Sequence, residues 1–228
     1  PRDAVARRRR CARAWEPSGT MLGDDLDPTG EGGGDLVERL LTVLLVTSPV
    51  RSNPSTEMLE WTLGSYVEKA KLARCAKLVV SDGFTVAAPG QKERPKSGRI
   101  PVDWAAPYAE FRDRLDALAL AGGDAGAFWN CRHLRMEQHK GFGGCTYCAL
   151  RLVTTPYVLV LQHDRPCLRA VEASRLVAAM HASQGTVKYV GLPTKASLAR
   201  AGAAAVMSRC HLRLGEDDMD QRAAAAAK

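Results

Sequence analysis

The chain has 228 residues, of which 46% are apolar and 25% charged, a composition typical of a globular domain. This composition excludes a disordered polar chain and a collagen-like repeat. A membrane bundle is excluded because the longest apolar runs, such as Tyr157–Leu161, fall far short of the ~20 residues of a spanning helix. The formal net charge of +7 favours anionic partners. Charges of both signs are interspersed along most of the chain, however, which argues against nucleic acid as the partner.

The cysteines and the ends of the chain bear on compartment and boundaries. Seven cysteines are scattered from Cys11 to Cys210 with no hydrophobic signal segment, which favours reduced thiols in an intracellular compartment, cytoplasmic or organellar. Residues 1–35 end in a glycine-rich stretch and predict a disordered N-terminal arm. We expect one folded domain over residues 36–215 and a truncated tail over residues 216–228.

The first part of this domain predicts a strand, a helix and a second strand. Leu41–Val46 is a nearly continuous apolar run, typical of a strand buried on both faces. Asn53 and Pro54 predict an N-cap and a first helical residue, and apolar side chains then recur at helical spacing through Ala70. Ala76–Ser81 is a second apolar strand. Such a βαβ unit pairs its strands in parallel with a right-handed crossover.

The rest of the chain continues the alternation of helices and strands. The pattern first predicts a surface loop over Thr85–Pro107, a helix over Tyr108–Leu118 and a strand within Phe128–Met136. It then predicts a glycine turn and short helix over Gly141–Val153 and a strand over Tyr157–Leu161. The last predicted elements are a helix over Leu168–Ala182, a strand-like segment over Val187–Gly191 and a helix over Lys195–Met207. This alternation predicts an α/β domain with a mostly parallel central sheet.

Polar residues follow three of the predicted strands. Thr47 and Ser48 follow the first strand, Asp82 follows the second, and Gln162-His163-Asp164 follows Tyr157–Leu161. Open parallel sheets bind ligands outside the carboxyl ends of their strands. These residues together would supply a hydroxyl, a carboxylate for a base or ribose and a second carboxylate for a divalent cation. The alternative for each one alone is that it caps a strand or a nearby helix.

The order of these motifs resembles that of family 2 glycosyltransferases. One matching stretch is Leu41–Phe84, with its Ser81-Asp82-Gly83 ending, and the other is His139–Asp164, with its glycines and final Gln162-His163-Asp164. The resemblance implies a GT-A-like, Rossmann-like three-layer sandwich with a mostly parallel central sheet. It also implies transfer of a sugar from a nucleoside diphosphate sugar to the hydroxyl of an unknown acceptor.

The resemblance also implies roles for individual residues. Thr47, Ser48 and Asp82 would contact the nucleotide, and Asp164 would match the last residue of the family's metal-binding Asp-x-Asp motif. Gln162 replaces the first aspartate of that motif, and an amide is a weaker oxygen ligand than a carboxylate. His163 would add a nitrogen ligand, which suits Mn better than Mg.

Two further positions are candidates for the chemistry of transfer. Lys140 precedes the glycine turn, where a helix N-terminus can meet phosphate, and it would pair with the diphosphate. The acidic cluster around Asp217 resembles the family's Glu-Asp motif, so Asp217 would be the general base that takes the acceptor's proton. The alternatives are a solvated lysine and a solvated acidic turn.

Two other functions compete with the transferase. A binding module that kept the fold and lost its chemistry is favoured by Gln162. A zinc-stabilised, basic nucleic-acid binder would use Cys145, Cys148, His163 and Cys167, whose spacing falls within the loose range of structural zinc sites. Plain buried thiols are the simpler interpretation of these cysteines.

Overall fold

A computed structural model describes residues 33–122 and 126–192. The chain divides into two compact units, Pro1–Ala179 and Met180–Lys228. All four strands of the main sheet belong to the first unit, and the description of the second unit ends at residue 192. The predicted helix over Lys195–Met207, the tail from residue 216 and nearly all of the N-terminal arm lie outside the described residues.

The first unit is built on a parallel four-stranded sheet. Its strands are β1 (Leu41–Thr47), β2 (Ala76–Ser81), β5 (Cys131–Arg135) and β6 (Tyr157–Gln162), arranged in the order β5-β2-β1-β6. Every neighbouring pair is parallel. The predicted α/β class with a mostly parallel central sheet is confirmed, and the arrangement is Rossmann-like.

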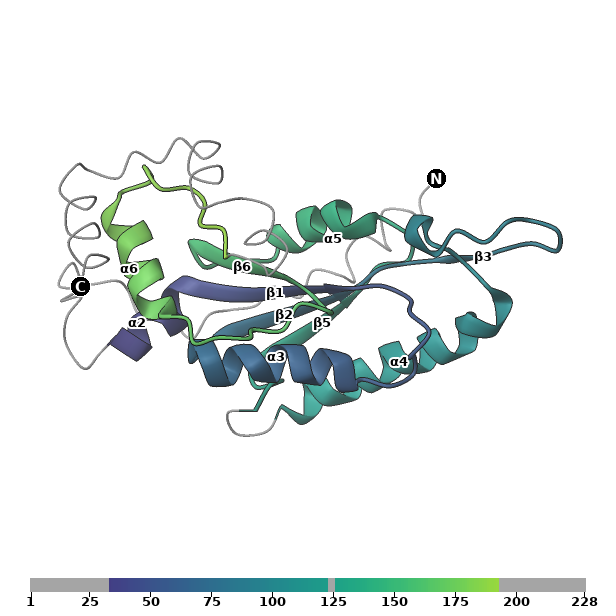
Figure 1. The fold of residues 1–228 in the computed structure, drawn as a ribbon, viewed down its shortest axis with the longest axis horizontal. Coiled ribbons are helices and arrows are strands. Elements are labelled where there is room, and N and C mark those ends of the chain that lie inside the picture. Colours follow the sequence, from purple (N-terminus) through teal and green to yellow (C-terminus); the bar gives the residue numbers. More distant parts are fainter. Residues whose placement is uncertain (1–32, 123–125, 193–228) are drawn as a thin grey trace, which may run out of the picture. The chain divides into compact units, whose positions relative to one another are not determined.

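Helices cover both faces of this sheet. α5 (Gly141–Leu150) lies on one face, while α3 (Glu57–Ala70) and α4 (Val102–Ala121) lie on the other (Figure 1). The remaining helices are α2 (Gly33–Leu40), which runs directly into β1, and α6 (Ala173–Ala182). Because both faces are covered, all seven residues of β1 are buried, which explains its continuous apolar sequence.

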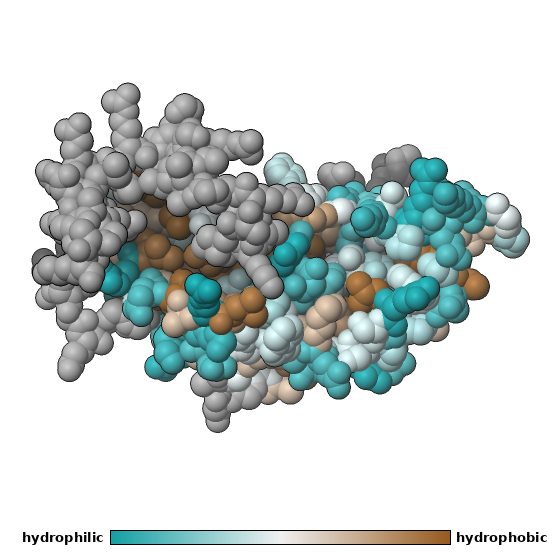
Figure 2. Space-filling view, in the orientation of Figure 1, coloured by the Kyte–Doolittle hydropathy of each residue, from teal (hydrophilic) through white to brown (hydrophobic). Residues whose placement is uncertain are grey.

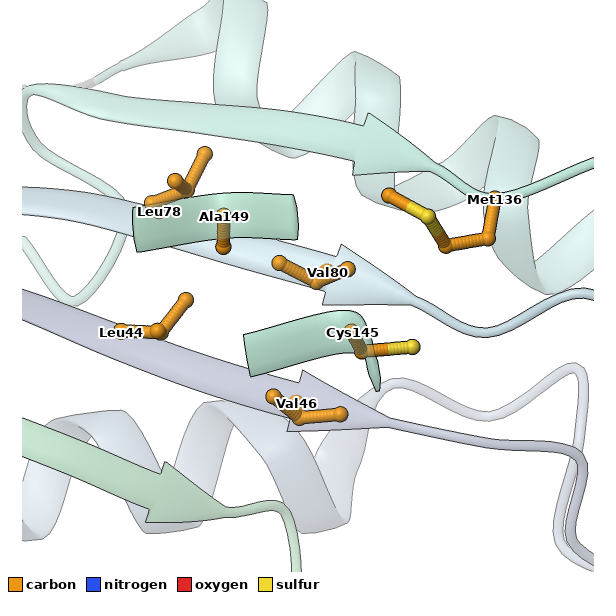
Figure 3. Close-up of a cluster of buried hydrophobic side chains, with 7 residues drawn as sticks. All are labelled: Leu44, Val46, Leu78, Val80, Met136, Cys145 and Ala149. Carbon is orange, nitrogen blue, oxygen red and sulfur yellow. The ribbon is translucent and has the colours of Figure 1, made fainter. Parts of the chain in front are cut away.

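The core between the sheet and α5 is a cluster of seven buried side chains. Figure 3 shows the cluster, which consists of Leu44 and Val46 from β1, Leu78 and Val80 from β2, Met136, and Cys145 and Ala149 from α5. Side chains alternate along a strand, so Val43 and Leu45 face the opposite side of the sheet, where α3 and α4 lie. β1 therefore stabilises both halves of the core.

The predicted start of α3 is wrong. The helix begins at Glu57, with Thr56 as its N-cap, and not after Asn53. The side-chain oxygen of Asn53 instead accepts a hydrogen bond from the Val50 amide at 2.8 Å, and the backbone turns back on itself at Val50–Asn53. Asn53 thus caps a turn of the loop and leaves the helix to start later.

The predicted surface loop over Thr85–Pro107 is only partly correct. It contains a second, two-stranded parallel sheet of β3 (Thr85–Val86) and β4 (Arg99–Ile100), with a short 3-10 helix over Pro95–Ser97. α4 then begins at Val102 and continues through Pro107, because Tyr108 and Phe111 are buried in the core and anchor it.

Two predictions near the end of the described chain also need correction. α6 begins at Ala173 and not near Leu168, because the preceding segment is bonded to α3: the Cys167 amide donates to Ser65 Oγ and the Val171 amide to the Lys69 carbonyl. Val187–Gly191 forms no strand within residues 126–192, and the Val187 amide bonds to Ser183 Oγ.

The burial of β1 leads to a first prediction. Leu44→Ala should lower the free energy of unfolding by about 2–5 kcal/mol, because Leu44 is fully buried in the cluster under α5 and the substitution leaves a cavity. Urea denaturation followed by circular dichroism measures the change. Leu120→Ala is the matched control, since Leu120 is 87% exposed and its loss should cost less than about 0.5 kcal/mol. Equal effects of the two substitutions would contradict this account of the core.

Candidate functional site

The polar strand ends lie along one edge of the sheet. In the register of the parallel pairs, Thr47 lies beside Ser81, and Val46 lies beside Gln162. Continuing each pairing past the strand ends places Asp82 and Asp164 on either side of β1. Neighbouring strands are about 4.8 Å apart, so the two backbones are separated by roughly 10 Å at this edge.

The strand order makes one position on this edge special. From β1 the chain builds β2 and β5 on one side, and then crosses to the other side of β1 to add β6. The gap between β1 and β6 is therefore the switch point of the sheet, where Rossmann-like folds bind their ligands. Ser48 follows β1 at this gap, and Gln162, His163 and Asp164 end and follow β6.

Two hydroxyl groups of α3 hold the loop that follows β6. Thr62 Oγ1 donates to the His163 carbonyl at 2.6 Å, and Ser65 Oγ accepts from the Cys167 amide at 2.7 Å. Both side chains are buried on the otherwise apolar face of α3. The loop is thus fixed by a rigid helix. Asp164 has 54% of its side chain exposed, and its carboxylate lies 3.9 Å from Nε of the similarly exposed Arg165. Sequence reasoning missed Thr62 and Ser65, although polar residues at two positions of an apolar stripe were the available signal.

The other residues at the switch point differ in accessibility. Thr47 is only 1% exposed, so the predicted contact of its side chain with a nucleotide is not supported, whereas Ser48 is half-buried. Burial lowers the pKa of His163, although the negative charge of Asp164 and the Val46 backbone oppose this. Its Nδ1 is buried and has no hydrogen-bond partner within the described residues. His163 is therefore neutral at pH 7, with one inward-facing nitrogen.

Asp82 has a different role from the predicted one. Its side chain is 2% exposed, and its carboxylate accepts hydrogen bonds from three backbone amides: Gly83 and Lys140 at 2.8 Å and Gly141 at 2.9 Å. The ring nitrogen Nδ1 of His139 also lies 2.7 Å from Oδ2. Because α5 begins at Gly141, the carboxylate caps this helix from a different strand. These internal bonds argue against Asp82 as a nucleotide ligand.

A close approach of two loops makes this cap geometrically feasible. A Cβ atom added to Gly83 would lie 2.3 Å from the Gln138 carbonyl carbon, so only glycine lets the loop after β2 pass so near the segment before α5. Lys140 contributes its amide to Asp82, and its side chain is exposed at the start of α5. The side chain of Lys140 is therefore accessible to solvent, and its contact with a diphosphate stays a prediction.

A buried polar network stands behind Asp82. His133 donates or accepts through both ring nitrogens, with Nε2 2.9 Å from Ser81 Oγ and Nδ1 2.6 Å from Asp116 Oδ1. Tyr108 Oη donates to the Asp82 carbonyl at 2.8 Å. The serine, histidine and aspartate have the connectivity of a hydrolase triad, but Ser81 is fully buried and no substrate reaches its hydroxyl. The network is therefore structural. Its members come from three separate elements, which is why sequence spacing gave no sign of it.

The described residues do not form a complete metal site. No group of three or more His, Cys, Asp or Glu side chains within them is arranged to hold a metal ion. Burial raises the pKa of Cys145 to about 12, so its thiol is protonated and is a poor zinc ligand. The exposed carboxylate of Asp164 does fit a Mg²⁺ or Mn²⁺ ion that arrives with a diphosphate, because Mg²⁺ binds through one or two carboxylates and substrate phosphates. The buried Nδ1 of His163 fits that role less well.

Comparison with protein-family models, with curated proteins and with solved structures finds no match to this chain. Within its described residues, none of the helices is both long and apolar enough to cross a bilayer. The proposed general base Asp217 lies outside the described residues. The residues that the structure does bring together at the switch point are Ser48, Gln162 and Asp164, and these carry the functional proposal below.

The cap of α5 leads to a second prediction. Asp82→Asn should lower the free energy of unfolding by about 2–4 kcal/mol, because an amide group cannot accept all of the hydrogen bonds that the buried carboxylate accepts. Hydrogen exchange should also quicken at the Lys140 and Gly141 amides. Asp103→Asn, at an exposed position in the first turn of α4, is the control and should cost less than about 1 kcal/mol. Unchanged exchange at the two amides would contradict the capping role.

The buried histidines lead to a third prediction, on pH. Burial lowers the pKa of His133 below its unfolded value, with Asp116 opposing the shift, so the unfolded chain binds more protons than the folded chain below about pH 6.5. The free energy of unfolding should therefore fall as the pH is lowered through this range. His133→Gln should flatten the decline only in part, because burial lowers the pKa of His163 as well. Urea denaturation at a series of pH values measures both slopes, and identical slopes would refute the assignment.

Proposed function

We propose that this protein is a GT-A-like glycosyltransferase that binds a nucleoside diphosphate sugar at the β1/β6 switch point. The observation that carries the proposal is the position of an exposed carboxylate, Asp164, beside Ser48 at the one gap where the strand order reverses. The order of motifs along the chain, which resembles that of family 2 glycosyltransferases, supports the same function.

The donor would lie across the edge of the sheet between the two strands. Ser48 offers a hydroxyl to the nucleotide from β1, while Asp164 faces the diphosphate from β6. A divalent cation, when bound, would neutralise the diphosphate as a leaving group, with Asp164 as its protein ligand. The fixed loop matters here because Thr62 and Ser65 of α3 hold its backbone before any donor binds. Lys140, exposed at the start of α5, supplies a further positive charge for the phosphates.

The acceptor's proton needs a base, and the sequence alone suggests Asp217, which lies outside the described residues, for that role. An inverting transfer forms a bond between the acceptor oxygen and the anomeric carbon while the bond from that carbon to the diphosphate breaks. The proton of the acceptor hydroxyl then passes to a carboxylate.

A non-catalytic binding module is the second candidate, and Gln162 is the observation that favours it. Gln162 is exposed at the end of β6, where the family motif has an aspartate. An uncharged amide would weaken the hold on a cation and leave Ser48 in place for the nucleotide. The module would therefore bind the donor and leave it intact.

Donor binding is the fourth prediction, tested by thermal shift. The panel consists of uridine, guanosine, adenosine and thymidine diphosphates, each tested with Mn²⁺. One of them should raise the Tm of the protein by a few degrees when its concentration is about a hundred times its Kd. Asp164→Asn should abolish the part of the shift that depends on Mn²⁺. Glu68→Gln is the matched control, because Glu68 is a highly exposed acid on α3 and its loss should change nothing.

Hydrolysis of the matching sugar nucleotide separates the two candidates. Slow release of free sugar that Asp164→Asn abolishes would support the transferase. A thermal shift without any hydrolysis, even with Mn²⁺ and a panel of acceptor sugars, would favour the binding module. The absence of a shift across the whole panel would overturn both.

A further inference from the structure

The segment that follows β2 forms a small basic lobe, Thr85–Ile100. It contains four basic residues, Lys92, Arg94, Lys96 and Arg99, and a single acid, Glu93, for a net charge of +3. Lys92, Arg94 and Lys96 are exposed, and no basic side chain of the lobe is paired with an acid within the described residues. The lobe thus concentrates nearly half of the chain's net positive charge in a short stretch of surface.

The lobe has a fixed backbone. The Thr85 amide donates to the Gly98 carbonyl at 2.7 Å, and the Ala87 amide donates to the Ile100 carbonyl at 2.9 Å. Gly98 has a φ of +73° and packs so closely on His139 that an added Cβ would lie 2.2 Å from the ring. The basic side chains are therefore presented on a scaffold that is anchored beside the capped end of α5.

Apolar side chains are exposed at the base of the same lobe. Val86 of β3 is 42% exposed, and Val102, two residues beyond β4, is 75% exposed. Ile100, the partner of Val86 across the strand pair, is fully buried and anchors the pair. Two exposed valines and three exposed cations within one short stretch, residues 86–102, form the combination that peripheral proteins use at an anionic membrane surface.

The form of the lobe also bears on the nature of its partner. It projects beyond the ends of the main strands, and the surface at this end is largely hydrophilic with apolar residues between (Figures 1 and 2). A projecting tip suits a flat bilayer better than a small ligand, which needs a concave site. Residues 85–100 contain no Phe, Tyr or Trp, and so lack the stacking platforms of single-strand nucleic-acid binders.

We propose that the basic lobe docks this protein onto membranes that contain anionic lipids. Lys92, Arg94 and Lys96 would lie against the lipid headgroups, and Val86 and Val102 would enter the interface between headgroups and acyl chains. The docking is independent of the proposed transferase activity, because it needs neither the switch point nor a sugar donor. Where both hold, the lobe would bring the switch point close to acceptors at a membrane.

Vesicle flotation tests the docking with the whole chain. The protein should float with phosphatidylcholine vesicles that contain about 30 mol% phosphatidylserine and not with phosphatidylcholine alone. Raising the ionic strength from about 0.1 to about 0.5 M should release it, because the added salt screens the charges. The triple variant Lys92→Gln, Arg94→Gln, Lys96→Gln should bind about tenfold or more weakly. Val102→Ser should weaken binding at about 0.1 M salt, because it removes an apolar side chain from the interface.

A matched triple variant controls for net charge. This control variant removes three positive charges from exposed positions outside the lobe, by the substitutions Arg132→Gln, Arg151→Gln and Arg169→Gln. It should leave flotation unchanged. Circular dichroism and an unchanged Tm show that each variant is folded. Failure to float with anionic vesicles, or equal losses in the two triple variants, would overturn the proposal. So would tighter binding of a single-stranded oligonucleotide that depends on the same lysines, since the lobe would then be a nucleic-acid site.

Discussion

The carboxylate of Asp82 is the contact on which the geometry of the sheet edge depends. It accepts hydrogen bonds from the amides that begin α5, and so joins the end of β2 to the helix that covers one face of the core. The cluster of Leu44, Val80 and Cys145 lies directly beneath this junction. A buried carboxylate is costly unless it is fully bonded, and here three backbone amides supply those bonds. The cap and the core are consequently formed together.

The strands could be predicted from the sequence because burial on both faces leaves a continuous apolar run. Leu41–Val46 and Tyr157–Leu161 each match an observed strand to within a residue. Element starts were less predictable, since they depend on partners distant in sequence. α6 begins late because its preceding segment is bonded to Ser65 and Lys69 of α3, and nothing in the local pattern of residues 168–172 reports those bonds.

The candidate site was predictable in position and only partly in role. The polar strand ends were expected on one edge, and the register of the strands places them there. An aspartate after a strand has the same sequence signature whether it faces a ligand or a set of backbone amides, so Asp82 could not be distinguished from Asp164. What separates the two is burial, because the helix that Asp82 caps starts 59 residues further along the chain.

This difference divides the edge into a closed half and an open half. At β2 and β5, the Asp82 carboxylate bonds to backbone amides, Tyr108 bonds to the Asp82 carbonyl, and His133 bonds to Ser81 and Asp116, so these groups are engaged within the protein. At β1 and β6, the hydrogen bonds from α3 fix only the backbone of the loop and leave the side chains of Gln162 and Asp164 exposed. A rigid backbone that presents exposed polar side chains favours ligand binding, since the ordering has occurred before the ligand arrives, although a ligand would have to compete with Arg165 for the Asp164 carboxylate. The half of the edge at β2 and β5 is therefore bonded internally, and the gap between β1 and β6 is where exposed polar side chains follow the strands, which is why the proposed donor site lies there.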